Sequence, residues 1–301
     1  MPPRDPKGLI LCADDFAMSD GVSATIAELA AAGRLSAVSC MAAAPGWAAQ
    51  APRLRGLGDG VAVGLHIVLS DETPLGPMPR LAPDGRLPGC DPLTIQAYAG
   101  NAPLCEVADE VARQFDAFQA EHGAPPDFVD GHQHVHMLPG LRSIVLEVTR
   151  RRAPFAWVRD CADQLGAVLA RPFPTRALRS GLLSRGLSRD AARLGLRTNR
   201  GFSGYYDFHA DYAALFPRFL AHAGPAHLVM CHPGRGAANG DTIAQARMRE
   251  AEVLASPRFA ETLERAGLAL TAYRPAEGTI LPTRPSPQGG FSGPQMPAYH
   301  S

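Results

Sequence analysis

The chain contains 301 residues, 46% of them hydrophobic, which is enough for one large α/β domain or two small ones. Its 29 basic and 29 acidic residues give a formal net charge of zero, which argues against a nucleic-acid partner. The sequence has no apolar run near the roughly 20 residues of a membrane span, no signal-peptide core and six scattered cysteines without Cys-x-x-Cys spacing, so we expect a reduced, cytoplasmic protein.

The first part of the chain alternates short apolar runs with amphipathic segments. The runs at residues 8–13, 38–41 and 61–67 predict strands. A helix is expected after Ser19, a typical N-cap residue, and another through Trp47. This alternation is typical of a parallel sheet.

Residues 70–103 interrupt the alternation. The segment is rich in proline, and we expect a long irregular loop, of the kind that commonly acts as a lid or binding element. A helix over residues 104–121 and a short apolar strand at 127–129 follow.

The second half of the chain continues the α/β pattern. Expected helices and strands alternate at residues 140–151, 155–158, 211–222, 227–231, 242–255 and 268–273, with a further helix starting at Ser256-Pro257. Residues 171–200 hold eight arginines and one acidic residue, Asp190. We favour a solvated helical excursion over residues 160–200, with a site for an anionic substrate or lipid headgroup as the alternative.

The composition changes near the C-terminus. Beyond residue 280 it turns to Pro, Gly and Ser, which predicts a disordered tail over residues 280–301. We therefore expect a single domain over residues 1–279, in which the 70–103 loop and the Arg-rich excursion are the irregular parts.

Three of the ten histidines alternate along one short segment. His132, His134 and His136 follow the strand at 127–129 and Asp130, and a continued strand would place them on one face. An acid and several imidazoles on one surface suit a divalent metal ion, although the histidines of a polar strand end can also simply hydrogen-bond one another. Same-face neighbours lie about 6.6 Å apart on a strand, whereas metal bonds are about 2 Å long. One of the three, or an adjacent pair, is therefore expected to bind.

Further polar side chains stand at the ends of the expected strands. They are Asp14, Asp15, His66, Asp130, His132, Arg159 and His232. The carboxyl ends of parallel strands gather on one face of an α/β fold, so five distant segments deliver acids, imidazoles and a guanidinium to one place. Alone, the Asp14-Asp15 pair would be a solvated strand end and His66 a core histidine; together they favour a site.

Two adjacent carboxylates can have different catalytic roles. One can bind a metal ion while the other takes a proton from water that the ion activates. His232 is able to protonate a leaving amine from the opposite side. The sequence shows no Gly-rich phosphate loop and no Ser-His-Asp nucleophile elbow, so it predicts hydrolysis with water as the nucleophile.

At these residues the sequence resembles the YdjC-like (ChbG-type) carbohydrate deacetylase family. The matching pieces, in order, are Ala13-Asp14-Asp15-Phe16, Gly64-Leu65-His66, the segment 130–136 and His232-Pro233-Gly234. The resemblance covers roughly residues 8–273. It implies a distorted (β/α) barrel related to polysaccharide deacetylases, one divalent ion (Mg²⁺ or Zn²⁺), and hydrolysis of an N-acetyl group from an amino sugar with release of acetate.

The resemblance also implies a role for each matching residue. The metal ligands would be Asp15, His66 and His132, the general base Asp14 and the general acid His232. The residues expected to contact these groups or the substrate are Asp130, His134, His136 and Arg159. Family members usually have glycine after Asp-Asp-Phe, where this chain has Ala17; that departure affects the turn but removes no ligand.

Two alternative functions stand beside the carbohydrate deacetylase. In the first, the substrate is a glycolipid such as a hopanoid-linked amino sugar, and the Arg-rich segment faces a membrane. In the second, the chain is a non-catalytic metal- or carbohydrate-binding protein, which the presence of both base and acid disfavours. Membrane contact is expected only with a glycolipid substrate. The resemblance is compatible with a homodimer, although the sequence shows no apolar stripe that indicates one.

Overall fold

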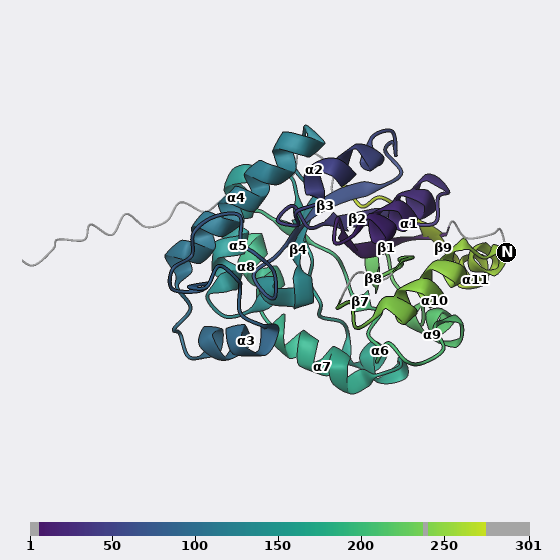
Figure 1. Ribbon diagram of the computed structural model, residues 1–301. Coiled ribbons are helices and arrows are strands. Elements are labelled where there is room, and N and C mark those ends of the chain that lie inside the picture. Colours follow the sequence, from purple (N-terminus) through teal and green to yellow (C-terminus); the bar gives the residue numbers. More distant parts are fainter. Residues whose placement is uncertain (1–5, 237–239, 275–301) are drawn as a thin grey trace, which may run out of the picture.

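The computed structural model describes residues 6–236 and 240–274 (Figure 1). The disordered tail expected over residues 280–301 lies outside the described residues. Among the described residues, no helix combines the length and apolarity that crossing a bilayer demands.

A single parallel sheet forms the centre of the molecule. Its strands are β1 (Lys7–Phe16), β2 (Ala37–Cys40), β3 (Ala62–Ile67), β4 (Phe128–Gly131), β5 (Trp157–Val158), β6 (Arg197–Thr198), β7 (Phe202–Ser203), β8 (His227–Cys231) and β9 (Leu268–Leu270). The hydrogen-bonded order is β6-β5-β4-β3-β2-β1-β8-β7, and β9 also pairs with β1. This is the cyclic order of an eight-stranded (β/α) barrel in which β6 and β7 are not paired. The predicted fold class, a distorted (β/α) barrel in one domain, is confirmed.

Helices surround this sheet (Figure 1). They are α1 (Asp20–Ala31), α2 (Trp47–Gln50), α3 (Cys90–Tyr98), α4 (Leu104–His122), α5 (Leu141–Arg152), α6 (Leu165–Ala170), α7 (Pro174–Leu183), α8 (Leu187–Arg193), α9 (Tyr212–Phe219), α10 (Ala244–Ala255) and α11 (Pro257–Arg265), with 3-10 turns η1 (Ala51–Leu54) and η2 (His132–Met137). Ser19 caps α1 as expected, because its side chain accepts a hydrogen bond from the Val22 amide.

Alternation along the strands separates two apolar layers. In β1, Leu9 and Leu11 pack outward with the helices, whereas Ile10 and Cys12 belong to a second cluster with Phe128. Within this inner cluster, the rings of Phe128 and Trp157 stack with centroids 4.5 Å apart. The indole of Trp157 donates to the Tyr273 carbonyl at 2.8 Å, which ties the chain that follows β9 to the barrel interior.

Several predicted elements need correction. The 70–103 segment is not wholly irregular, because α3 forms within it. The histidine segment is not a strand: the chain leaves β4 at Gly131 and turns into η2. The closing strand ends at Leu270, and the short strands β6 and β7 were not predicted, since two-residue strands have no periodicity to detect.

Gly64 lets β3 and β4 approach each other inside the barrel. A Cβ atom at this position would lie 2.5 Å from the Phe128 ring, and Phe128 is fixed by its stack on Trp157. We predict that Gly64→Ala lowers the free energy of unfolding by about 1–3 kcal/mol through overpacking, measured by urea denaturation. Gly60→Ala is the matched control, because a Cβ there meets nothing within 4 Å; equal effects of the two changes would contradict the packing argument.

Candidate active site

A bulge at the end of β1 brings two adjacent carboxylates into one cavity. Ala13 pairs with Val38 and Phe16 with Cys40, so β1 contains one residue more than β2 between these pairs. Asp15 adopts a left-handed backbone with φ 67°. On a regular strand Asp14 and Asp15 would face opposite sides, but the bulge redirects the chain and both side chains line the same cavity.

In the turn after the two aspartates, Ala17 adopts a backbone conformation that favours glycine. Ala17 has φ 78°, a conformation that glycine adopts without steric cost. The glycine that is usual at this position in the resembling family therefore has a conformational reason. Ala17 adopts the same conformation at some cost, and its amide donates to the Ser23 hydroxyl at 3.0 Å.

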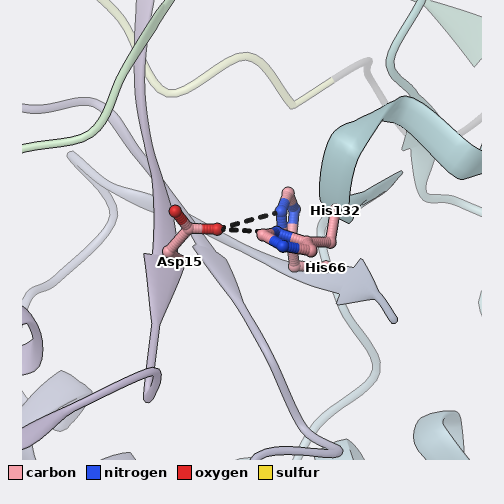
Figure 2. Close-up of side chains that lie close together, drawn as sticks. All are labelled: Asp15, His66 and His132. Carbon is pink, nitrogen blue, oxygen red and sulfur yellow. Dashed lines mark hydrogen bonds and ion pairs between the residues drawn. The ribbon is translucent and has the colours of Figure 1, made fainter. Parts of the chain in front are cut away.

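Three side chains from distant strand ends meet beside this bulge (Figure 2). Asp15 Oδ1 lies 3.0 Å from His132 Nδ1 and 3.4 Å from His66 Nε2, and one atom from each residue lies within 4.8 Å of the others. Two ligands bonded tetrahedrally to one ion at about 2.1 Å would lie about 3.4 Å apart. The arrangement can therefore hold a divalent cation with little movement. His132, with 14% of its side chain exposed, leaves one side of the group open to the cavity.

Neighbouring groups orient two members of this trio. Arg247 donates to Asp15 Oδ2 at 2.7 Å, so Oδ1 is the oxygen that faces the histidines. Asp130 Oδ1 lies 2.6 Å from His66 Nδ1 and accepts from the Ser39 hydroxyl at 2.5 Å. A proton on Nδ1 leaves Nε2 free to bind an ion, as in many carboxylate–histidine–metal sites.

The same contacts determine the protonation of His66. Burial lowers the pKa of its imidazole, but Asp130, and then Asp15 and Asp14, outweigh this effect and raise the pKa to about 10. Without a cation, His66 therefore carries two protons at neutral pH. Cation binding at Nε2 requires the loss of one of them, so metal affinity at this site is expected to rise with pH.

Asp14 is held by a buried guanidinium. Arg159 is fully buried and donates to both Asp14 oxygens at 2.6 Å, and it also pairs with Asp130. Burial raises the pKa of Asp14, but Arg159 outweighs burial and lowers the pKa below its ordinary value. Asp14 is therefore a fixed carboxylate at neutral pH. Cys12 and Asp130 also lie near Asp14, but the Arg159 guanidinium already lies between them and contacts all three side chains.

His232 lies at the end of β8 and lines the same cavity. Its amide donates to Glu250 Oε2 at 2.5 Å, and its Nδ1 has no hydrogen-bond partner among the described residues. Burial lowers the pKa of the imidazole to about 4, so His232 is neutral at pH 7.

The other two histidines of the 130–136 segment have separate environments. Gln133 and His134 adopt positive φ angles of 50° and 61°, which breaks the alternation expected of a strand. His134 lies edge-on to Phe202 and Tyr205 in the cavity wall. His136 points elsewhere and donates from Nε2 to the Arg159 carbonyl at 3.0 Å. The expectation of three histidines on one face is wrong, and only His132 reaches Asp15.

Two residues of α10 act on the site and were missed by sequence reasoning. Arg247 binds Asp15, and Glu250 accepts from the His232 amide and from the Tyr206 hydroxyl. They lie three residues apart and are both buried, so they share one face of the helix. A charged pair on the buried face of an amphipathic helix was the available signal, because such groups are rarely buried unless they are paired.

The site opens into a cavity of about 1070 Å³. Residues from the proline-rich segment line it, including Asp71, Glu72 and Arg86. Arg176 and Arg179 of the Arg-rich segment line it as well. That segment is partly helical and partly exposed: α7 and α8 lie in it, but Arg197 belongs to β6 and Arg171 is buried in an ion pair with Asp163. The two cavity-lining arginines therefore do not simply face solvent.

Glu250 makes the stability of the protein depend on pH. Burial raises the pKa of its carboxyl from 4.5 to about 7, so the folded state binds this proton more tightly than the unfolded state, and stability is lost as the pH rises from 4.5 through 7. Glu250→Gln removes the ionisation and keeps an acceptor for the His232 amide. We predict that the variant gains up to about 3 kcal/mol of unfolding free energy relative to the unaltered protein between about pH 5 and about pH 8. Urea denaturation of both proteins at the two pH values measures this difference, and a pH-independent difference would contradict it.

Comparisons with known proteins identify relatives that align with most of the chain. A curated chitooligosaccharide deacetylase of Serratia marcescens is 30% identical over 279 residues, covering 89% of this chain and 98% of the relative. That of Salmonella schwarzengrund (strain CVM19633) is 32% identical over 276 residues, covering 89% and 96%. The names of both relatives give the reaction class, carbohydrate deacetylation, that the sequence predicts for this chain. A crystal structure from Enterococcus faecalis V583 matches in fold, with a TM-score of 0.67 at 21% identity, covering 88% of this chain and 97% of that one.

The match extends to a model of a whole family. The model of the YdjC-like proteins matches residues 8–265, which include both aspartates of the bulge, His66, the 130–136 segment and His232. The matched range begins within β1 and ends at the last residue of α11, so it takes in almost the whole barrel. The chain therefore belongs to the YdjC-like protein family.

Proposed function

We propose that this protein is a metal-dependent hydrolase that removes an N-acetyl group from an amino sugar or oligosaccharide and releases acetate. The observation that carries the proposal is that ligand atoms of Asp15, His66 and His132 lie within 4.8 Å of one another, at the wall of a large cavity. The likeness to chitooligosaccharide deacetylases over 89% of the chain supports the reaction class.

The donor set favours one class of cation. Two imidazole nitrogens and one carboxylate oxygen suit Zn²⁺ or another transition metal better than Mg²⁺, which prefers oxygen ligands. Such an ion supplies Lewis acidity, lowering the pKa of water and polarising the amide carbonyl. In this proposal Asp15, His66 and His132 hold the ion, while Arg247 and Asp130 keep the ligand atoms oriented.

Asp14 is the proposed general base. Its carboxylate is ionised at neutral pH and held from one side by Arg159, while Asp14 also lines the cavity in which water would stand. The guanidinium reduces the basicity of Asp14 but fixes its position, and general-base catalysis depends on geometry first and pKa second.

His232 is the proposed general acid. Because its pKa is about 4, its imidazole is neutral at pH 7. The proton that Asp14 takes from the water must therefore pass to His232 before it reaches the leaving amine. The imidazolium so formed is a strong acid and gives its proton readily to the leaving amine. His232 lines the same cavity as Asp14, in which the leaving amine would lie.

The cavity suits a sugar chain better than a small acetyl compound. At about 1070 Å³, it is at the upper end of the size of ligand sites, roughly 300–1,000 Å³. Tyr205, Tyr206 and Phe208 line it and offer apolar faces for sugar rings, while Asp71 and Glu72 can accept hydrogen bonds from hydroxyl groups.

Removing a proposed metal ligand is expected to abolish both binding and turnover. Asp15→Asn and His132→Ala should lose stoichiometric Zn²⁺ binding and release acetate from chitobiose at the background rate, because two ligands do not hold the ion in this geometry. Metal content of the purified variants and an acetate assay measure the two effects. His209→Ala is the control, since His209 is exposed and outside the site. Retained binding in both ligand variants would contradict the assignment.

Removing the proposed base should separate chemistry from metal binding. Asp14→Asn is expected to retain Zn²⁺ but to lower kcat by about 100- to 10,000-fold, the usual contribution of a positioned acid or base. Single-turnover kinetics with metal analysis of the same sample provide the measurement. Stoichiometric metal binding without hydrolysis of any acetylated sugar by the unaltered protein would instead favour a non-catalytic binding protein.

A further inference from the structure

Exposed apolar side chains are concentrated on three short helices. The described residues include ten large hydrophobic side chains that are exposed, and six of these lie on α3, α6 and α7: Ile95, Tyr98, Leu165, Leu169, Leu178 and Leu182. Within each helix the two residues are three or four positions apart, so each pair forms one exposed helical face. Their exposed fractions reach 70% at Ile95 and 68% at Leu182. We call these six residues the apolar rim.

The apolar rim lies beside the mouth of the active-site cavity. Cys90 and Thr94 of α3 line the cavity, as do Arg179 and Leu183 of α7. Helix α6 immediately precedes α7 and packs against it. In Figure 1 the three helices lie along the same lower edge of the molecule. Clustered apolar residues at a cavity mouth indicate a surface that is covered during function.

Exposed arginine side chains lie beside the apolar rim, on and between α7 and α8. Arg176, Arg179, Arg185 and Arg189 are exposed on α7, on α8 and between them, and none of the four forms an ion pair with a carboxylate in the part of the chain that the structure describes. The one acidic residue of the segment, Asp190, is paired with Arg142 and Arg193. Asp91 of α3 is also exposed, and Asp71 and Glu72 line the cavity, so the four arginines give the surface along α7 and α8 a local excess of positive charge.

This combination indicates one kind of partner. A second copy of the chain, related by twofold symmetry, would bring the same arginines together across the contact and so be opposed by charge repulsion. An anionic bilayer instead accepts leucine and tyrosine side chains at the level of its headgroups and attracts arginine. We propose that the apolar rim and its arginines dock the cavity mouth onto an anionic lipid surface.

Vesicle sedimentation tests the docking directly. The unaltered protein is expected to bind phosphatidylcholine vesicles that contain phosphatidylglycerol, to bind pure phosphatidylcholine vesicles less, and to be released by salt. The double variant Leu178→Ser/Leu182→Ser should lower the partition coefficient by about tenfold or more, and Arg185→Glu/Arg189→Glu should weaken binding to the anionic vesicles alone. Acetate release from soluble chitobiose should be unchanged in both, because none of these four residues is part of the catalytic group.

Matched controls define the contrary result. Phe155→Ser removes a ring that is 60% exposed and precedes β5, at the end of the sheet away from the site. Arg151→Glu changes an exposed charge on α5. Both variants should bind as the unaltered protein does. Absence of vesicle binding by the unaltered protein, equal loss in the controls, or self-association through Leu178 and Leu182 without vesicle binding would overturn the proposal. Since sedimentation requires no turnover, failure of docking and failure of the deacetylase assay are separate outcomes.

Discussion

A buried network of charges organises the structure around the proposed site. Within residues 6–236 and 240–274, the carboxylates of Asp14, Asp15, Asp130 and Asp241 contact two guanidinium groups, those of Arg159 and Arg247. Four acids against two bases leave an excess of two negative charges, and buried charge is costly unless it is compensated. Without a cation, the second proton of His66 supplies part of the missing positive charge. A divalent cation between Asp15, His66 and His132 would supply all of it.

This electrostatic requirement explains the irregular backbone at the site. The bulge in β1 turns two successive carboxylates into the same cavity. His132 contacts Asp15 at the start of η2, and the left-handed residues that follow it separate His136, which donates to the Arg159 carbonyl. Helix α10 contributes two contacts to the site: Arg247 donates to Asp15, and Glu250 accepts from the amide of His232, which follows β8. Strained conformations at these positions are maintained because the surrounding contacts determine them.

The sequence predicted the features that depend on local pattern. The parallel strands followed from the alternation of apolar runs and amphipathic segments, and the family resemblance implied the barrel. The carboxyl ends of the strands were the correct place to look for Asp14, Asp15, His66 and His232. The strand pattern alone left open which of the three neighbouring histidines would bind, and the family resemblance selected His132. The roles of these residues stay proposals, but their meeting in one place is a property of the fold.

What the sequence did not show depends on contacts between distant segments. A bulge exists only relative to its partner strand, so β1 alone does not reveal it. The turn at Gln133 and His134 uses conformations that neither residue type demands. Arg247 is 232 residues from Asp15, and the apolar rim comes from three helices whose faces are exposed only because of how they pack. For the central claim, the most direct measurement is anomalous diffraction from crystals grown with Zn²⁺. The account predicts one peak within about 2.0–2.2 Å of Asp15 Oδ1, His66 Nε2 and His132 Nδ1; an ion bound by other residues, or none at these three atoms, would contradict it.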